Sequence, residues 1–336
     1  METHAHGHAG EISRRERRLG RSGLEVSDIG LGLWGMSGWT GSDEERSKRV
    51  LRSSVDLGCT FFDTAWAYGE GNSDRLLGEL MADRPKSPIV AASKVPPLDR
   101  HWPALSTSSF GEVFPSVYVK EMVDKIRTAL RVERVPLLQL HVWDDHWAGD
   151  PGFRSLVEEL KVSGSIQYFG LSLNRWEPWN GLRAIETGLV DTVQVIYNIF
   201  DQSPEDELFP ACARADVGVI ARVPLDEGSL GGNLSAETRF PSEDWRSRYF
   251  GPENLPQTLR HVEAVREVLP VSMTLPEMAL RFVLSDPRVS TTIVGVRTEE
   301  HLVDNLDAAK AGPLDARLIE VLRGMRWDRA PAPWSD

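Results

Sequence analysis

The chain has 336 residues, a formal net charge of −12 and two cysteines. The acidic balance argues against a nucleic-acid or anionic-membrane surface. Cys59 and Cys212 form no C-x-x-C pair, so no disulfide framework is indicated, which is consistent with a reducing cytoplasm. No apolar run reaches the roughly 18 residues of a membrane span, and the N-terminus lacks the apolar segment of a secretory signal. We therefore expect a cytoplasmic protein without a membrane partner.

Taken in order, the chain begins with two short elements around 17–19 and 24–26, which are joined by GRSG and predict a β-hairpin. Eight β-rich runs follow, and they predict strands at 29–33, 60–63, 89–93, 137–141, 166–171, 192–196, 217–222 and 290–295. Amphipathic stretches between them predict helices at 43–57, 74–82, 117–131, 153–162, 205–215 and 299–309, with a further helix at 314–324. The segment 228–256 is rich in Gly, Ser, Asn and Pro and predicts a long loop.

Alternating strands and helices predict an α/β fold with a parallel sheet, whose buried strands read as continuous apolar runs. Eight strands are enough to close a barrel. We therefore expect a (β/α)₈ TIM barrel with an N-terminal β-hairpin and extended βα loops. A single catalytic domain would span 16–325, between a flexible tail at 1–15 and a C-terminal tail at 326–336. The alternative is a doubly wound open sheet.

That alternative has one motif in its favour. Residues 30–35 satisfy G-x-G-x-x-G, and Asp56 follows about 20 positions on, as in a dinucleotide-binding fingerprint. The fingerprint requires a helix to open at its third glycine, so that phosphate lies on the helix N-terminus. Gly38 and Gly41 discourage a helix there, so these glycines are interpreted as a bend in the first strand close to a ligand.

Four polar residues lie at or just after the ends of three successive predicted strands. Asp63 ends the second strand, and Tyr68 lies in the loop after it. Lys94 directly follows the third strand, and His141 ends the fourth. Successive strand ends are neighbours at the barrel mouth. Hydride addition to a carbonyl builds negative charge on oxygen, which a tyrosine acid could meet. A lysine would lower the phenol pKa, an aspartate would keep that lysine charged, and a histidine would orient the carbonyl.

At these residues the chain resembles the aldo-keto reductase family. The resemblance rests on FFDTAWAYGEGNSDRLLGE, AASKVPP and LLQLHVWDD, and on the later segments GLSLNRW, VQVIYNIF, ARVPLDEGSLGG and IVGVRTEEHLVDNLDAA. It runs from about residue 17 to residue 310, with the motifs in the family order. It implies NADP(H) as cofactor and Asp63, Tyr68, Lys94 and His141 as the catalytic set.

The resemblance also implies a cofactor that lies extended across the barrel mouth. The implied contacts are Ser172, Asn174 and Gln194 for the carboxamide, Tyr197 stacked on the nicotinamide, Arg222, Pro224, Leu225, Gly228 and Leu230 along the pyrophosphate, Gly295, Arg297, His301 and Asn305 at the adenosine end, and Gly32, Leu33, Trp34 and Asp63 as further neighbours. Arg297 suits a 2′-phosphate because a guanidinium fork matches phosphate geometry. The alternative for Arg297 is a surface salt bridge with Glu300.

Tryptophans are frequent near the first four strand ends. They are interpreted as the apolar wall of a substrate pocket, with packing against the barrel rim as the alternative. The pocket residues would be Trp34, Trp66, Trp102 and Trp143, with Trp39 and Trp147 nearby.

The expected function is the NADP(H)-dependent reduction of an aldehyde, ketone or sugar-like carbonyl to an alcohol, or the reverse, on a small-molecule substrate and without a metal. Two alternatives remain. One is a metal-dependent barrel hydrolase that uses His141, Asp144, Asp145 and His146. The other is a cofactor-bound regulatory or sensor protein on the same fold. Neither the substrate nor the oligomeric state is indicated.

Overall fold

The structure is a computed structural model that describes residues 16–38 and 41–329. The tail expected at 1–15 and the tryptophan expected at position 39 lie outside the described residues. None of the described helices is both long enough and apolar enough to cross a membrane.

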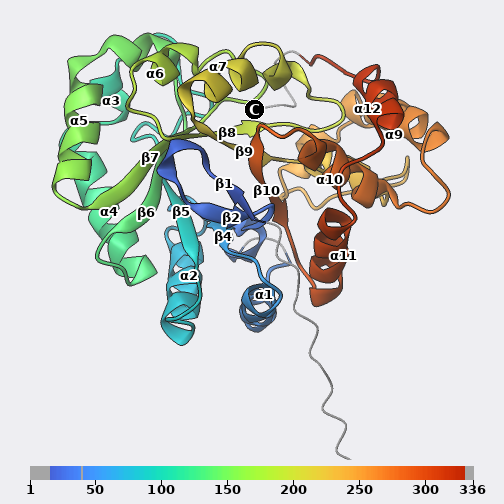
Figure 1. Ribbon diagram of the computed structural model, residues 1–336, viewed down its shortest axis with the longest axis horizontal. Coiled ribbons are helices and arrows are strands. Elements are labelled where there is room, and N and C mark those ends of the chain that lie inside the picture. Colours follow the sequence, from blue (N-terminus) through green and yellow to red (C-terminus); the bar gives the residue numbers. More distant parts are fainter. Residues whose placement is uncertain (1–15, 39–40, 330–336) are drawn as a thin grey trace, which may run out of the picture.

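Eight parallel strands form a closed barrel in the order β10-β3-β4-β5-β6-β7-β8-β9, which confirms the predicted (β/α)₈ fold (Figure 1). The barrel closes where β10 pairs with β3, from Thr292 opposite Ile29 to Gly295 opposite Gly32. Each predicted strand corresponds to one barrel strand within a few residues. The strands are β3 (Ile29–Gly32), β4 (Phe61–Asp63), β5 (Val90–Val95), β6 (Val135–Leu140), β7 (Ile166–Ser172), β8 (Thr192–Ile196), β9 (Gly218–Arg222) and β10 (Val289–Gly295).

Helices surround the barrel, and most of them bury an apolar face in its hydrophobic core. In α4 the predicted face of Val119, Met122, Val123, Ile126 and Leu130 is buried. The α-helices are α1 (Glu44–Asp56), α2 (Asn72–Asp83), α3 (Phe110–Val113), α4 (Ser116–Leu130), α5 (Pro151–Val162), α6 (Leu182–Glu186), α7 (Leu208–Ala215), α8 (Arg246–Tyr249), α9 (Asn254–Glu267), α10 (Leu275–Ser285), α11 (Glu299–Lys310) and α12 (Ala316–Arg323).

The predicted N-terminal hairpin is present as β1 (Glu16–Arg18) and β2 (Glu25–Ser27), which pair antiparallel. Leu19 and Val26 join the apolar cluster inside the barrel, with Phe61, Ala92 and Ile220 among its members. A Cβ at Gly218 would lie 2.8 Å from the Leu19 side chain, so a glycine is needed where the hairpin meets β9. The hairpin therefore covers one end of the barrel and leaves the other end for the loops that follow the strands.

Three segments require comparison with the sequence-based expectation: the turn after β3, the loop at 228–256 and residues 326–329. After β3 the chain makes a short 3₁₀ turn at Trp34–Met36, and α1 begins only at Glu44, so no helix opens at Gly35. The long loop expected at 228–256 contains α8 and the start of α9. Residues 326–329, expected in a tail, pack on the barrel, since the Trp327 amide donates to the Phe200 carbonyl at 2.9 Å.

Candidate active site

The centre of the barrel mouth is a buried ion pair. Lys94 on β5 and Asp63 at the end of β4 are 0% and 2% exposed. The Lys94 Nζ donates to Asp63 Oδ2 at 2.6 Å and to the Thr64 carbonyl at 2.8 Å. The Gln194 amide on β8 donates to the other Asp63 oxygen at 2.7 Å. A buried ion pair needs such additional hydrogen bonds to offset desolvation, and here three strands together supply them.

Tyr68 and His141 lie beside this pair. Tyr68 follows β4, and its ring centroid lies 5.2 Å from the Lys94 Nζ. His141 directly follows β6, and its ring meets the Tyr68 ring edge-on with the centroids 5.7 Å apart. The structure thus brings all four predicted catalytic residues together at one end of the barrel, because β4, β5 and β6 are adjacent strands.

Burial shifts the pKa values of the Tyr68 phenol and the His141 imidazole in opposite directions. Burial raises the pKa of the Tyr68 phenol above its usual value, and the Lys94 ammonium opposes that rise. Burial also lowers the pKa of His141 well below its usual value, and Lys94 and Arg222 act in the same direction. The imidazole is therefore neutral near pH 7, and its Nδ1 has no hydrogen-bond partner among the described residues. A protonated phenol and a neutral imidazole both face the mouth.

Two further charged residues belong to this environment: Arg222, which the resemblance placed along the pyrophosphate, and Asp74, which the sequence analysis did not single out. Arg222 ends β9 and donates to the Leu173 carbonyl at 3.1 Å. Its charge opposes the rise in the Tyr68 pKa and adds to the fall in the His141 pKa. Asp74 on α2 is fully buried, and burial raises its pKa to about 7. The signal for Arg222 was the strand-end position that identified the tetrad. The signal for Asp74 was a carboxylate on the buried face of a helix.

The expected carboxamide residues lie at the ends of β7 and β8. Ser172 and Asn174 are buried, and the Asn174 amide donates to Glu177 at 2.9 Å, while its oxygen has no partner among the described residues. Gln194 is also buried, but its amide nitrogen is already bonded to Asp63. Asn174 therefore has a buried polar atom, Oδ1, without a partner among the described residues.

The segment expected along the pyrophosphate forms a tight turn after β9. Its residues Asp226, Glu227 and Gly228 have successive positive φ angles of 46°, 55° and 101°. Within this turn the Asp226 N–H donates to the Val223 carbonyl at 3.1 Å and the Gly228 N–H to the Leu225 carbonyl at 2.9 Å, so both N–H groups are bonded inside the turn. Pro224 is buried and Leu225 half-buried, whereas Leu230 is fully buried with its N–H bonded to the Leu225 carbonyl at 3.1 Å. The Leu230 side chain and N–H are thus occupied by the fold.

The expected adenosine end lies where the barrel closes. Gly32 and Gly295 face each other across β3 and β10, and a Cβ at Gly295 would meet no heavy atom within 4 Å. Arg297 is exposed and makes no ion pair with Glu300 or any other described residue. The Thr298 hydroxyl caps α11 by accepting from the His301 N–H at 3.2 Å. The remaining residues are His301, which is exposed, Asn305, which is buried, and Leu33, whose side chain lies in the core.

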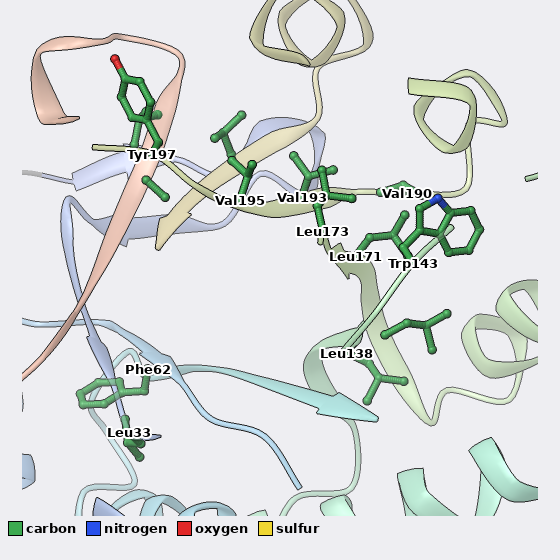
Figure 2. Packing of buried hydrophobic residues seen from close by; sticks show 14 of the residues in the cluster. Leu33, Phe62, Leu138, Trp143, Leu171, Leu173, Val190, Val193, Val195 and Tyr197 are labelled. Carbon is green, nitrogen blue, oxygen red and sulfur yellow. The ribbon is translucent and has the colours of Figure 1, made fainter. Parts of the chain in front are cut away.

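Tyr197 does not reach the mouth, which corrects its expected role in stacking on a nicotinamide. Its ring is 1% exposed and packs against Phe209 and Phe282, with centroids 5.0 and 5.7 Å away. Its hydroxyl donates to Glu205 at 2.6 Å. Figure 2 shows Tyr197 as a member of the buried hydrophobic cluster. Because its ring is buried against Phe209 and Phe282, it is not available for stacking on a ligand.

The tryptophans separate into two groups. Trp102 is 42% exposed and lies edge-on to His141, with the ring centroids 5.8 Å apart. Trp34 lies edge-on to Trp245 of the long loop, with the ring centroids 6.4 Å apart. Trp143 is fully buried within the hydrophobic cluster (Figure 2). Its ring centroid lies 4.8 Å from that of Phe153, and Trp66 packs on Gly71 toward α4. The pocket expected from Trp66 and Trp143 is therefore wrong, because both side chains turn away from the mouth to pack on the flank of the barrel. Trp147 is buried in the same way.

Three of the four residues of the hydrolase alternative, Asp144, Asp145 and His146, are engaged in local structure. The Asp145 carboxylate accepts from Trp143 Nε1 at 2.9 Å and from the N–H groups of Arg183 and Ala184, at the start of α6. His146 Nδ1 lies 2.5 Å from an Asp144 oxygen. In the part of the chain that the structure describes, no three His, Cys, Asp or Glu side chains gather as metal ligands.

The mouth also has the donor and acceptor set that a nicotinamide cofactor would need. Three buried polar atoms lack a partner among the described residues, namely His141 Nδ1, Asn174 Oδ1 and Arg222 Nε. A buried polar atom without a partner is costly in a finished fold. An amide and a phosphate are groups that Asn174 and Arg222 could bind, so the residues present fit such a cofactor.

The fold and this site define an oxidoreductase on a (β/α)₈ barrel. The model of the Aldo/keto reductase family matches residues 28–325, and the chain belongs to this family of nicotinamide-dependent enzymes. It is 27% identical to the uncharacterized oxidoreductase YqkF of Bacillus subtilis, over 92% of this chain and 95% of that protein.

Solved structures share the fold. The holo form of an aldo-keto reductase from Bacillus halodurans has a TM-score of 0.75 at 24% identity, covering 96% of this chain and 100% of that one. An aldo/keto reductase from Klebsiella pneumoniae, solved in complex with NADP and acetate, has a TM-score of 0.68 at 21% identity, covering 96% and 99%.

Proposed function

We propose that the protein is an NADP(H)-dependent oxidoreductase that reduces the carbonyl group of a small aldehyde, ketone or sugar-like molecule to an alcohol, or runs the reverse reaction. The observation that carries the proposal is that Tyr68 and His141 both lie beside the buried Lys94–Asp63 pair. The Lys94 Nζ is 5.2 Å from the centroid of the Tyr68 ring. Family membership alone would leave the chemistry open, because one fold can serve several functions.

In this mechanism the bound cofactor would supply the hydride, and the residues of the chain manage the proton and the charge. The neutral His141 donates a hydrogen bond to the carbonyl oxygen and orients it. Tyr68 gives its phenolic proton to that oxygen as negative charge develops there. Lys94 stabilises the resulting phenolate, and Asp63, held by Gln194, keeps Lys94 charged and in place. The balance is one carbonyl, one hydride and one proton to one alcohol.

Cofactor preference rests on Arg297. Its guanidinium is exposed next to the Gly295 opening and has no carboxylate partner among the described residues, which leaves it free for a 2′-phosphate. The NADP in the Klebsiella relative supports the same preference. We expect NADPH to bind more tightly than NADH.

The substrate side of the mouth would be bordered by Trp102 and by Trp34 with its partner Trp245. Aromatic faces suit the apolar part of a substrate, whereas the oriented polar groups suit its carbonyl. The long loop that carries Trp245 would thus contribute to the choice of substrate.

The test is a panel of aldehydes, ketones and aldoses, each followed by loss of NADPH absorbance, with cofactor binding measured separately by fluorescence titration. Turnover of any carbonyl supports the reductase. NADPH binding without turnover across the panel would instead favour the regulatory or sensor alternative. No binding of either nicotinamide cofactor would overturn the proposal.

A further inference from the structure

Arg329, near the end of the described chain, has a buried side chain that forms ion pairs at the rim of the barrel. Its side chain is 2% exposed and donates to both Asp201, which follows β8, and Asp226, which follows β9. The bond to Asp226 is 2.7 Å long, and a further bond of 3.0 Å reaches the Tyr249 hydroxyl on α8. One side chain thus joins three segments that are far apart in sequence.

Asp226 belongs to the turn after β9, the segment on which the family resemblance puts the cofactor pyrophosphate. This turn carries two adjacent carboxylates, Asp226 and Glu227, where a dianionic group would have to lie. Each is matched by an arginine from another segment. Arg329 bonds Asp226, and Arg175 bonds Glu227 at 2.6 Å with the two side chains 25% and 13% exposed.

The charges around the turn balance. Three carboxylates, on Asp201, Asp226 and Glu227, meet three guanidinium groups, on Arg175, Arg222 and Arg329. Burial raises the pKa of Asp201, whereas Arg329 lowers it. Without Arg329, two buried carboxylates would lose their cation, and the turn would repel phosphate in a region where charges are only weakly screened.

We propose that Arg329 is a positioning residue for the cofactor: by neutralising Asp226 and Asp201 it gives the turn after β9 the charge at which a pyrophosphate can bind. The inference rests on the proposed function, because it assumes that a dinucleotide phosphate lies on this turn. The C-terminal segment would then set cofactor affinity from outside the catalytic tetrad.

A purely structural tie is the competing explanation, and the same segment offers a way to separate the two. Trp327 stacks on His261 with centroids 4.1 Å apart, and its amide donates to Phe200. Arg326 pairs with Asp206 at 2.7 Å on the surface. These contacts hold the segment on the barrel independently of Arg329, so its charge can be removed while the segment keeps its other anchors.

The experiment measures the Kd of NADPH by fluorescence titration in the full-length wild type and in Arg329→Met, Arg329→Lys and the double variant Arg329→Met/Asp226→Asn. Arg326→Met is the matched control, because it removes an arginine from the same segment without touching the turn. Urea unfolding of each variant checks that the comparison is made on folded protein.

We expect Arg329→Met to raise the Kd roughly tenfold or more, the scale on which breaking a buried charge pair weakens binding. Arg329→Lys should lose less, and Arg326→Met should match the wild type. The double variant decides between the explanations: removal of the unpaired carboxylate should recover part of the lost affinity, whereas a structural tie would be weakened further by the second change.

An unchanged Kd in Arg329→Met, or a double variant that binds no better than Arg329→Met, would overturn the inference while leaving the proposed function standing. Should Arg329→Met fail to fold, the Lys and double variants carry the same test. If the wild type itself binds no NADPH, the proposed function fails and this inference fails with it.

Discussion

His141 and Trp143 lie two positions apart after the same strand, yet their side chains enter different regions of the molecule. His141 faces the mouth beside Tyr68, whereas Trp143 is fully buried on the flank with Phe153 and Trp147. The mouth contains polar groups whose positions depend on charge partners, such as Lys94 on Asp63. The flank contains rings whose positions depend on volume and on apolar contact.

This difference explains why strand-end position identifies one kind of residue better than the other. A buried lysine or carboxylate must find a partner, and at the end of a barrel strand the available partners are on neighbouring strands. A tryptophan is buried equally well inside a pocket or against a helix, so its proximity to a strand end does not determine its direction.

The largest expected effect removes the phenolic hydroxyl from the mouth. Tyr68→Phe should lower the single-turnover rate of NADPH oxidation by about 10²–10⁴-fold, the usual contribution of general acid catalysis, with cofactor binding retained. Lys94→Met should lose a similar factor, and the two losses should not multiply, because both disable one proton transfer. Tyr168→Phe, at the closed end of the barrel, is the control. Near-normal rates in Tyr68→Phe would mean that the proton comes from another group.

The flank should respond in stability rather than in rate. Trp143→Ala leaves a large cavity beside Phe153, and such truncations cost about 3–5 kcal/mol in free energy of unfolding. Urea denaturation measures the loss, and the ratio of kcat/KM for bulky and small substrates should stay unchanged in the protein that remains folded. A changed ratio at unchanged stability would return Trp143 to the substrate pocket.

Asp74 tests how strongly a carboxylate near the mouth depends on a partner. It accepts from the Ser93 hydroxyl at 2.7 Å, and its other oxygen has no partner in the described part of the chain. Its folded pKa of about 7 lies above the unfolded value of 3.8. From about pH 4 to pH 7 the folded state therefore keeps a proton that the unfolded state releases, and stability falls as the pH rises.

Asp74→Asn mimics the protonated acid and should remove this fall. The free energy of unfolding of the variant, relative to wild type, should rise by at most about 1.4 kcal/mol per pH unit across that window. Urea unfolding at pH 4.5 and pH 8 measures it. The same difference at both pH values would show that Asp74 is ionised throughout, with Lys94 as the nearest cation to explain it.

Arg297 contrasts with the paired arginines of the rim. Arg297→Ala should weaken NADPH binding by roughly 1.5–3 kcal/mol, the range of a hydrogen bond to a charged group, and leave NADH binding nearly unchanged. Titration of both cofactors measures this, with Glu300→Gln as the control for local charge. Equal losses for the two cofactors would remove Arg297 from a 2′-phosphate site.

Trp102 should give the smallest effect, confined to selectivity. Trp102 is 42% exposed and contacts His141. Trp102→Ala should therefore raise the activation free energy behind kcat/KM by about 1 kcal/mol more for bulky carbonyls than for small ones, with little change in stability. Kinetics on a short and a long aldehyde measure the difference. A uniform loss for both substrates would indicate that Trp102 only supports His141.

Most of the barrel could be predicted from the sequence because buried parallel strands and one-sided helices leave strong periodic patterns, as in β6 and α4. The tetrad could be predicted because its members are polar where apolar strands end. Tyr197 and Trp66 could not be placed, since a ring at such a position packs on either side of the strand. Arg329 could not be foreseen because its partners, Asp201 and Asp226, both lie more than a hundred residues away in the chain.

Arg17 in the N-terminal hairpin donates to the carbonyls of Leu284 and Val289, and β3 pairs with β10. The first and last strands of the barrel are thus joined to each other, and each bond spans most of the chain. Such long-range pairing is slow, because loop-closure entropy must be overcome before the contacts form. During synthesis the barrel cannot close until residues near 295 have left the ribosome. Until then the edges of β3 and of the latest strand to emerge are unpaired, and the nascent chain is most exposed to aggregation at these two edges.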